Sequence, residues 1–228
     1  MENRDLSPQP NDNYILTPDE ERAISEKAEE LYAKRIAPYA PDLAPPTRGA
    51  IINFQKLVFV VDHYFEHNEN LNPASLNSFW KQFKKFLDDL EMPKDLQATL
   101  LQDIKDYADI EASIRTGKRL AEYEIRFFYF KKSCDVRMQR HIIRYLNKQT
   151  ASSSDSEIIR DILEEIEDDV DDIEEDKLTP FGGNRFLEIL NSKDVEKLNE
   201  YDTFINSLPN LPQDLVQRIL DKISKFGV

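Results

Sequence analysis

The chain has 228 residues, of which 40% are hydrophobic and 10% aromatic, so it can bury the core of one domain or at most two. A formal net charge of -14 and an isoelectric point near 4.7 exclude nucleic acid and anionic membrane surfaces as expected partners, because both are bound through clustered Lys and Arg. The chain holds only 5 glycines, too few for the turns of a barrel or sandwich, and its one cysteine, Cys134, excludes an internal disulfide.

These features, together with the helical spacing of the apolar residues, predict an all-α fold, a single bundle of about eight to ten helices. Residues 1–16 are polar and contain prolines, which predicts a flexible N-terminal arm, and residues 17–228 are expected to form a single all-helical domain. No window of about eighteen residues is apolar throughout, and the first ten residues contain no apolar segment. We therefore expect a cytoplasmic protein without an integral membrane segment.

The first helix is expected to start at residues 17–20, TPDE, which combine a Thr cap, a Pro at the first helical position and a Glu two residues later. It should end near residue 37, because four prolines lie between residues 38 and 46. A second helix is expected from residue 47 or 49 to about residue 67. It is apolar nearly all round at its centre, which is typical of a buried helix.

The end of this second helix carries two candidate sites. Asp62 and Glu66 lie one turn apart, and such pairs are more often surface carboxylates than metal ligands. The same stretch contains His63-x-x-Glu66-His67, the H-x-x-E-H order in which two His can bind zinc on one helix face, with Glu as a base. We keep zinc as the less favoured alternative, because peptidases of this type need a third acidic ligand and a larger domain.

The remaining apolar residues recur at helical spacing in several further segments. Gly117, flanked by basic residues, predicts a turn between two of these helices. Short amphipathic segments after Gly182-Gly183 are expected to close the bundle. The expected helices cover residues 75–91, 93–116, 118–148, 184–190, 192–208 and 212–226.

Basic side chains gather on the long helix expected over residues 118–148. Arg137, His141 and Arg144 share one face of it, and Arg140 lies beside them. Two interpretations stay open at this point. The arginines either neutralise an acidic helix through surface ion pairs, each contributing under ~1 kcal/mol, or bind a diphosphate.

An acidic helix is expected over residues 161–177, DILEEIEDDVDDIEEDK, after a connector whose Ser or Asp residues can cap it. Its apolar residues fall at steps of three and four, which predicts one buried stripe. Carboxylates clustered beside such a stripe repel one another unless a cation lies among them. The stripe consists of Ile159, Ile162, Leu163, Ile166, Val170 and Ile173. The flank consists of Glu165, Asp168, Asp169, Asp172 and Asp176, while Glu164, Asp171 and Glu175 are expected to point outward.

The motif Asp168-Asp169-x-x-Asp172-x-x-x-Asp176 resembles the second aspartate-rich motif of the class I isoprenoid synthases. This superfamily includes prenyl diphosphate synthases, squalene and phytoene synthases and terpene cyclases. In that family the motif lies on a helix that lines the active-site cavity, and a glycine-containing loop follows. Here residues 178–186, LTPFGGNRF, follow the motif. The resemblance implies a compact terpenoid-synthase-like bundle around a central cavity.

The resemblance also implies a site and a reaction. Magnesium would be held by Asp168, Asp169, Asp172, Asp176, Asp62 and Glu66. The diphosphate of a prenyl substrate would be bound by Arg137, Arg140, Arg144, Lys177 and Arg185. The expected function is that of a prenyl transferase or terpene-synthase-like enzyme that ionises an allylic diphosphate; no catalytic residue is assigned.

The chain also departs from the family in being shorter than most members and in having a weak first acidic motif. The alternative is therefore a non-catalytic helical binding protein whose acidic helix docks a basic protein partner. A homodimer is the other assembly that we consider.

Overall fold

The computed structural model describes residues 14–37, 43–150, 153–179, 181–208 and 213–226. These residues form helices and connecting turns and no strand, so the predicted all-α fold is confirmed. None of the helices in these ranges has the length and apolarity needed to cross a membrane. The eleven α-helices are α1 (Pro18–Leu31), α2 (Pro45–His67), α3 (Pro73–Asp89), α4 (Lys94–Ser113), α5 (Ile125–Lys132), α6 (Cys134–Leu146), α7 (Asp155–Asp171), α8 (Ile173–Asp176), α9 (Arg185–Ser192), α10 (Val195–Ser207) and α11 (Gln213–Ser224).

Local sequence signals begin and end several of these helices. At the start of α1, the Thr17 hydroxyl accepts a hydrogen bond from the backbone N–H of Glu20, and the Glu20 carboxylate accepts one from the Thr17 backbone, which completes a capping box. Ser154 and Glu157 form the same arrangement at the start of α7. Gly117 has a φ of 81°, the left-handed conformation that the predicted turn requires.

The single helix predicted over residues 118–148 is wrong, because the chain forms α5 and α6 with a break at Ser133. The Glu124 carboxylate caps two backbone N–H groups of the first turn of α5, so the chain before it stays extended. At Ser133 ψ is 17°, and the serine hydroxyl donates to the carbonyl of Phe130 at 3.3 Å. A serine that bonds to nearby backbone competes with helix geometry, which apolar spacing alone does not reveal.

The acidic segment is also divided, into α7 and the short α8, at Asp172, where ψ is 9°. Of the arm predicted over residues 1–16, residues 1–13 lie outside the described residues. Tyr14 is packed on α2, where its hydroxyl lies 2.7 Å from His63 Nδ1 and its ring meets Tyr64 edge-on at 4.9 Å. The chain just before α1 is therefore held against α2.

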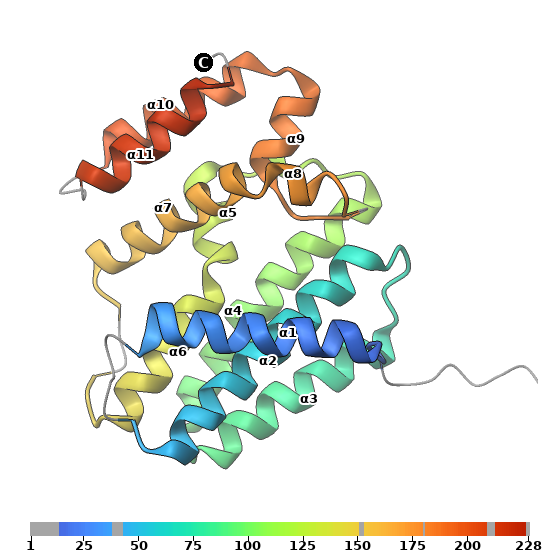
Figure 1. Cartoon of the computed structure of the whole chain (residues 1–228), viewed down its shortest axis with the longest axis vertical. Coiled ribbons are helices and arrows are strands. Elements are labelled where there is room, and N and C mark those ends of the chain that lie inside the picture. The colour runs from blue at the N-terminus through green and yellow to red at the C-terminus, as the bar shows by residue number, and fades with distance from the viewer. Residues whose placement is uncertain (1–13, 38–42, 151–152, 180, 209–212, 227–228) are drawn as a thin grey trace, which may run out of the picture.

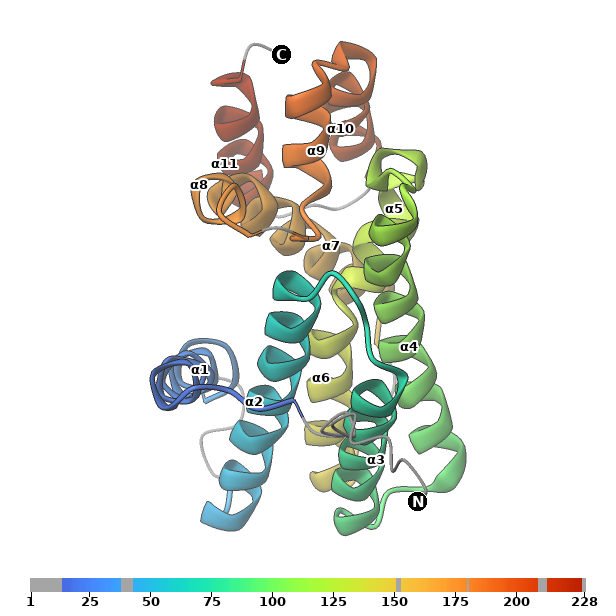
Figure 2. The ribbon, with the colours of Figure 1, turned by 90° about the vertical axis from the view of Figure 1, so that its right-hand side faces the viewer.

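The helices form two layers (Figures 1 and 2). In one layer α2, α3, α4 and α6 run side by side as a four-helix bundle, and α1 crosses the outside of α2. In the other layer α7 packs against α5, α9 and α11, and α10 covers α5 and α9. Each layer has its own apolar core, and a third, smaller cluster joins α1 to α2. The two principal cores meet at α4, whose Ile104 and Ala108 belong to the core of the bundle and whose Ile110 belongs to the other core.

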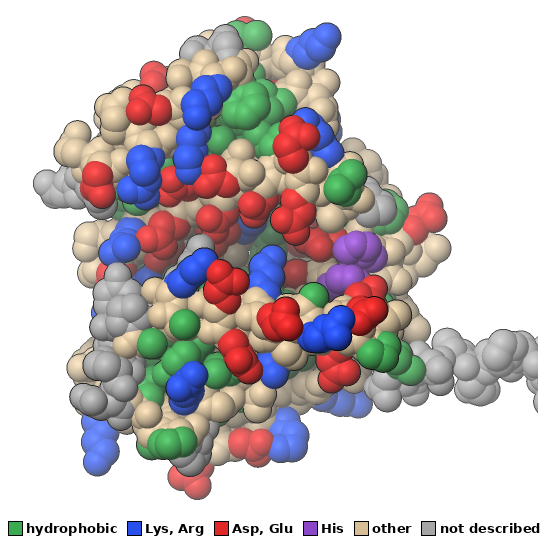
Figure 3. Space-filling view, viewed as in Figure 1, with side chains coloured by type: hydrophobic (Ala, Val, Ile, Leu, Met, Phe, Trp, Pro, Cys, Tyr) green, Lys and Arg blue, Asp and Glu red, His purple; other side chains and the backbone are tan. Residues whose placement is uncertain are grey.

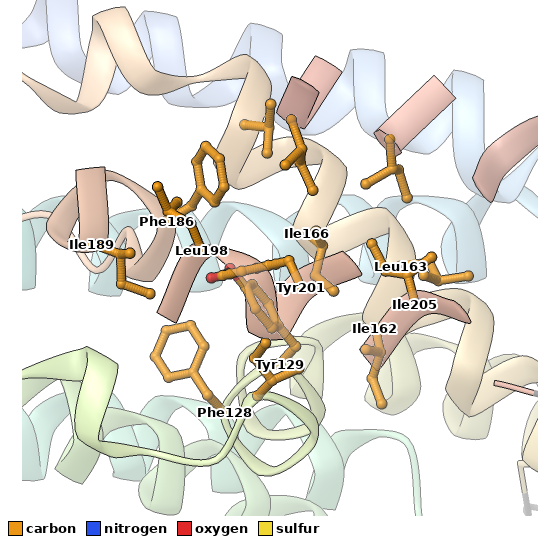
Figure 4. Packing of buried hydrophobic residues seen from close by; sticks show 14 of the residues in the cluster. Phe128, Tyr129, Ile162, Leu163, Ile166, Phe186, Ile189, Leu198, Tyr201 and Ile205 are labelled. Carbon is orange, nitrogen blue, oxygen red and sulfur yellow. The ribbon is translucent and has the colours of Figure 1, made fainter. Parts of the chain in front are cut away.

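A buried carboxylate, Asp169, joins the helices of the second layer. Its side chain is 0% exposed, forms an ion pair with Lys132 of α5, and accepts hydrogen bonds from the Tyr129 hydroxyl at 2.8 Å and the Arg185 backbone N–H at 3.1 Å. The Tyr129 hydroxyl also lies 2.8 Å from that of Tyr201 on α10, inside the apolar cluster shown in Figure 4. Asp169 therefore fixes how α7 is rotated about its own axis.

We predict that Asp169→Ala lowers the free energy of unfolding by about 3–5 kcal/mol, because Lys132 would keep a charge in the interior without its partner. The measurement is denaturation by urea. Asp171→Ala is the matched control: this neighbour is half exposed, pairs with Lys222 at 2.7 Å on the surface, and should change stability by less than about 1 kcal/mol. Equal losses from the two substitutions would contradict the role assigned to Asp169.

Candidate functional site

A cavity of ≈ 890 Å³ opens between α1 and the α7–α8 segment, over one end of the four-helix bundle. Figure 3 shows it as a hollow bordered by acidic side chains, with histidines at one end. Its inner surface is apolar in part, because the bundle helices turn some of their core residues toward it, and polar in part, since Gln55, Tyr107 and Glu111 also line it. These apolar residues include Val58, Val61, Phe65, Phe83, Ile104 and Ala108.

Five of the six carboxylates that the resemblance assigns to metal binding line this one cavity. Three of them, Asp168, Asp172 and Asp176, come from α7 and α8, and the other two, Asp62 and Glu66, come from α2. Two acidic walls from distant parts of the sequence thus face one hollow. The sixth carboxylate, Asp169, is absent from the lining because it points into the core, one residue or about 100° around α7 from Asp168.

Other acidic side chains line the cavity without having been assigned to it. Glu165 was placed on the correct flank, but Glu175 was expected to point outward and instead lines the rim, since the break at Asp172 changes the direction of α8. Glu111 of α4 and Asp135 of α6 were not singled out at all. The signal for Glu111 was present: it continues the apolar stripe formed by Leu100, Ile104 and Ala108, so an acid occupies a core-facing position.

The loop between α8 and α9 closes one end of the cavity. The backbone N–H of Phe181 donates to the Glu66 carbonyl at 3.2 Å, which joins the loop to α2. The Asn184 amide donates to the Asp169 carbonyl and to the Asp176 carboxylate, each at 2.6 Å. Asn184 thus joins this loop to α7 at Asp169 and to α8 at Asp176.

The carboxylates of both walls are held in an electrostatically unfavourable setting. Burial, together with the charges of Glu66 and Asp135, raises the pKa of Asp62 well above its ordinary value. Burial also raises the pKa of Glu66 and, with Asp168 and Asp176 adding to it, that of Asp172. A cation in the cavity would relieve this repulsion, so the site favours ligands that carry positive charge or bring it with them.

Three lysines line the cavity: Lys27 of α1, Lys34 just after α1, and Lys132 of α5. The Lys27 ammonium lies 5.1 Å from the centre of the Phe59 ring. It acts to lower the pKa values of Asp62, Glu66 and Asp172, so it lies within electrostatic reach of both walls. Burial opposes the charge on Lys132, but Asp169 and Glu165 outweigh it and raise the pKa of this lysine above its ordinary value.

The arginines expected to bind a diphosphate on α6 lie away from the cavity lining. Arg137 is buried, with its guanidinium 3.9 Å from the centre of the Phe130 ring. Arg140 pairs with Asp161, and Arg144 pairs with Glu157 at 2.5 Å, both on the first two turns of α7. These contacts favour the alternative left open by the sequence, in which the basic helix neutralises the acidic one.

The two remaining candidates for diphosphate binding also lie outside the lining. Lys177 is about half exposed and pairs with Glu174 at 2.5 Å. Arg185 is fully buried, and its guanidinium donates to the Tyr123 carbonyl at 3.2 Å and to Glu200 at 3.4 Å. Sequence spacing places these residues near the acidic motif, but it does not show that Arg185 turns to partners before α5 and on α10.

The histidines considered for zinc line one end of the cavity and bind protein groups. Their rings stack with centroids 4.1 Å apart; His63 Nδ1 faces the Tyr14 hydroxyl, and His67 Nδ1 lies 3.0 Å from the His63 carbonyl. In the part of the chain that the structure describes, no three or more His, Cys, Asp or Glu side chains are grouped closely enough to hold a metal ion. The structure adds no support for zinc.

The donor set fits magnesium only when phosphate oxygens complete the coordination. Carboxylate oxygens are the ligands that Mg²⁺ prefers, and in phosphate-binding sites the ion commonly takes one or two of them together with waters and substrate oxygens. The two walls supply such carboxylates, although they are not gathered into a ready-made cage. Magnesium that enters with a phosphate-bearing ligand therefore suits the residues present.

Comparisons with known proteins leave the site to be interpreted from its own geometry. No family model matches the chain, no curated protein is found to be similar to it, and no solved structure matches it.

Glu111 gives the site a testable dependence on pH. Burial raises its pKa from 4.5 to about 7, although the hydrogen bond from Tyr107 and the charge of Lys132 act in the opposite direction. The folded protein therefore binds this proton more tightly than the unfolded chain does. The resulting stabilisation is complete below pH 4.5 and is lost as the pH rises through about 7.

We predict that Glu111→Gln stabilises the protein relative to wild type at pH 8 by up to about 3 kcal/mol, and that the difference shrinks toward pH 5. Urea denaturation at a series of pH values measures it. Glu164→Gln, which changes a carboxylate paired with Arg160 outside the cavity, is the control and should show no such trend. A difference independent of pH would mean that Glu111 has an ordinary pKa.

Proposed function

We propose that the cavity binds a prenyl diphosphate together with Mg²⁺ and that the protein is an isoprenoid synthase of the prenyl transferase or terpene synthase type. The observation that carries this proposal is the pairing of two acidic walls across a hollow whose inner surface is apolar in part. Such a site can hold both ends of an amphipathic ligand: the charged group through metal ions at the walls, and the hydrocarbon chain against the bundle.

The acidic walls would hold the metal ions. Asp168, Asp172 and Asp176 would contribute oxygens from one side, and Asp62 and Glu66 from the other. Bound magnesium would supply the positive charge that offsets the charge developing on a departing diphosphate. The raised pKa values of Asp62 and Asp172 support this assignment, because burial and neighbouring carboxylates disfavour their charge in the free protein and a cation would offset both effects.

The inner surface would accommodate the hydrocarbon chain and exclude water from an allylic cation. Phe65 and Phe83 lie among its lining residues, and an aromatic ring facing a desolvated cation contributes about 2 kcal/mol. Lysines of the cavity lining would bind the diphosphate in place of the expected arginines. Lys27 is the better placed of these, since it reaches both walls, whereas Lys132 is already paired with Asp169.

The alternative of a basic partner docking on the acidic helix is less well supported. On the outer flank of α7, Glu167 pairs with Arg218 at 3.1 Å and with Lys222 at 2.7 Å, and Asp171 also pairs with Lys222. Cations of α11 thus already neutralise this flank. The acidic face left for a ligand is the one that lines the cavity, which is a concave site and not a docking surface.

We expect Mg²⁺ and inorganic diphosphate together, at about a hundredfold above their dissociation constant, to raise the melting temperature by roughly 5–10 °C, and either one alone to have little effect. Asp172→Asn should abolish this shift while raising the melting temperature of the free protein, because it relieves repulsion from Asp168 and Asp176. Asp171→Asn is the matched control and should keep the shift.

A shift that any salt reproduces, or one that survives Asp172→Asn, would contradict the proposal. Release of diphosphate from geranyl diphosphate in the presence of Mg²⁺ then separates an active synthase from a protein that only binds the ligand. Catalytic turnover should be lost with Asp172→Asn and kept with Asp171→Asn.

Replacing Lys27 tests the electrostatic arrangement by itself. Wild type should bind Mg²⁺ alone only weakly, and Lys27→Met should bind it about three- to tenfold more tightly, because an ammonium no longer competes for the two walls. Isothermal titration calorimetry measures the change. Lys34→Met is the control: Lys34 pairs with Glu30 at 2.5 Å at the rim and should change the affinity by less than about twofold. Weaker magnesium binding by Lys27→Met would show that the lysine does not compete with the ion.

A further inference from the structure

One carboxylate of the cavity lining has an oxygen with no protein partner. Glu111 is 7% exposed and lines the cavity from α4. Its Oε1 accepts a hydrogen bond from the Tyr107 hydroxyl, whereas its Oε2 is buried and receives none. Gly183 packs closely on this side chain: a Cβ at that position would lie 1.8 Å from Oε1. The carboxylate is thus held closely by Gly183, with one oxygen hydrogen-bonded and the other buried without a partner.

A buried carboxylate oxygen without a partner is destabilising, and a ligand that donates a hydrogen bond to it removes that cost. The cations nearest to it are committed elsewhere. Lys132 is paired with Asp169, and Arg115 donates to backbone carbonyls, including that of Asn68 at 2.9 Å. Asp62 and Glu66 on α2 add negative charge around the same position. The missing partner should therefore be a cationic donor.

An organic ammonium ion fits this position better than a bare metal ion does. A metal ion needs several ligands at fixed short distances, and no group of three or more is present among the described residues. An ammonium ion donates three hydrogen bonds in adjustable directions, so it can bind carboxylates that are not arranged as a metal site.

The chain itself places one alkylammonium in the cavity. Lys27 lies over the Phe59 ring and reaches both acidic walls. Beside Glu111, Ile104 and Ala108 offer apolar surface for the methylene stem of a ligand.

We propose that the α4 side of the cavity binds a primary alkylammonium ion, which donates a hydrogen bond to Glu111 Oε2 and lays its stem along the apolar inner surface. This ligand class goes beyond the proposed function, because its binding requires neither magnesium nor diphosphate.

Titration calorimetry with n-hexylammonium chloride at pH 8, without magnesium or diphosphate, tests the proposal. Wild type should bind this ion saturably, and Glu111→Gln should bind it at least about tenfold more weakly, because an amide lacks the charge that strengthens the hydrogen bond. Glu164→Gln should bind as wild type does. Sodium chloride at the same ionic strength and 1-hexanol, which lacks the charge, should give no saturable heat.

Unchanged affinity in Glu111→Gln, or equal binding of 1-hexanol, would overturn the proposal. If Glu111→Gln does not fold, a crystal of the wild-type protein soaked in hexylammonium decides the question, and density for the ammonium away from Glu111 Oε2 counts against it. The melting-temperature response to magnesium with diphosphate is measured on the same samples. Failure of that response with hexylammonium binding intact would remove the synthase proposal alone, and the reverse result would remove this one.

Discussion

The buried contact between Asp169 and Lys132 determines what the acidic helix presents to its surroundings. An ionised carboxylate in an apolar core is tolerated only when charge and hydrogen bonds surround it, and here Lys132, Tyr129 and the start of α9 supply them. Because Asp169 points inward, the geometry of the helix fixes the directions of the side chains near it in α7. Asp168 and Asp172 must face the hollow, as they do.

Three flanks of α7 therefore have three separate tasks. The apolar stripe, with Ile162 and Ile166, enters the core of the second layer. The flank with Glu167 faces the cations of α11 and is neutralised by them. The flank with Asp168 faces the cavity and retains its surplus of negative charge. The burial of the apolar stripe and the ion pairs of Glu167 stabilise this helix, and they offset part of the repulsion among the carboxylates that face the cavity.

Sequence patterns predicted the features that depend on near neighbours in the chain. The capping residues Thr17 and Ser154, the turn at Gly117 and the apolar stripe of α7 all follow from local chemistry and were found where expected. The common direction of Asp168, Asp172 and Asp176 also followed, because helical periodicity relates them to a stripe that has to be buried.

Features set by contacts between distant segments were not predictable in this way. Because the chain breaks at Ser133, the guanidinium of Arg137 packs on the ring of Phe130, seven residues earlier. Arg185 is buried among partners from other parts of the chain. Asp169 could not be told from Asp168 by the motif, since the motif holds both, and only the position of Lys132 separates a structural acid from one that lines the cavity. Glu111 carried a usable signal, an acid within an apolar stripe.

The position of the cavity at the junction of two independent cores has a mechanical consequence. Its walls belong to different layers: α2 and α4 to the four-helix bundle, α7 and α8 to the layer above. A molecule bound at both walls would act as a brace between the layers. The chain itself joins them through the succession of α5 and α6, through the ion pairs of Arg140 and Arg144 with the start of α7, and through the loop that reaches α2. Filling the hollow should therefore stiffen the junction between the layers.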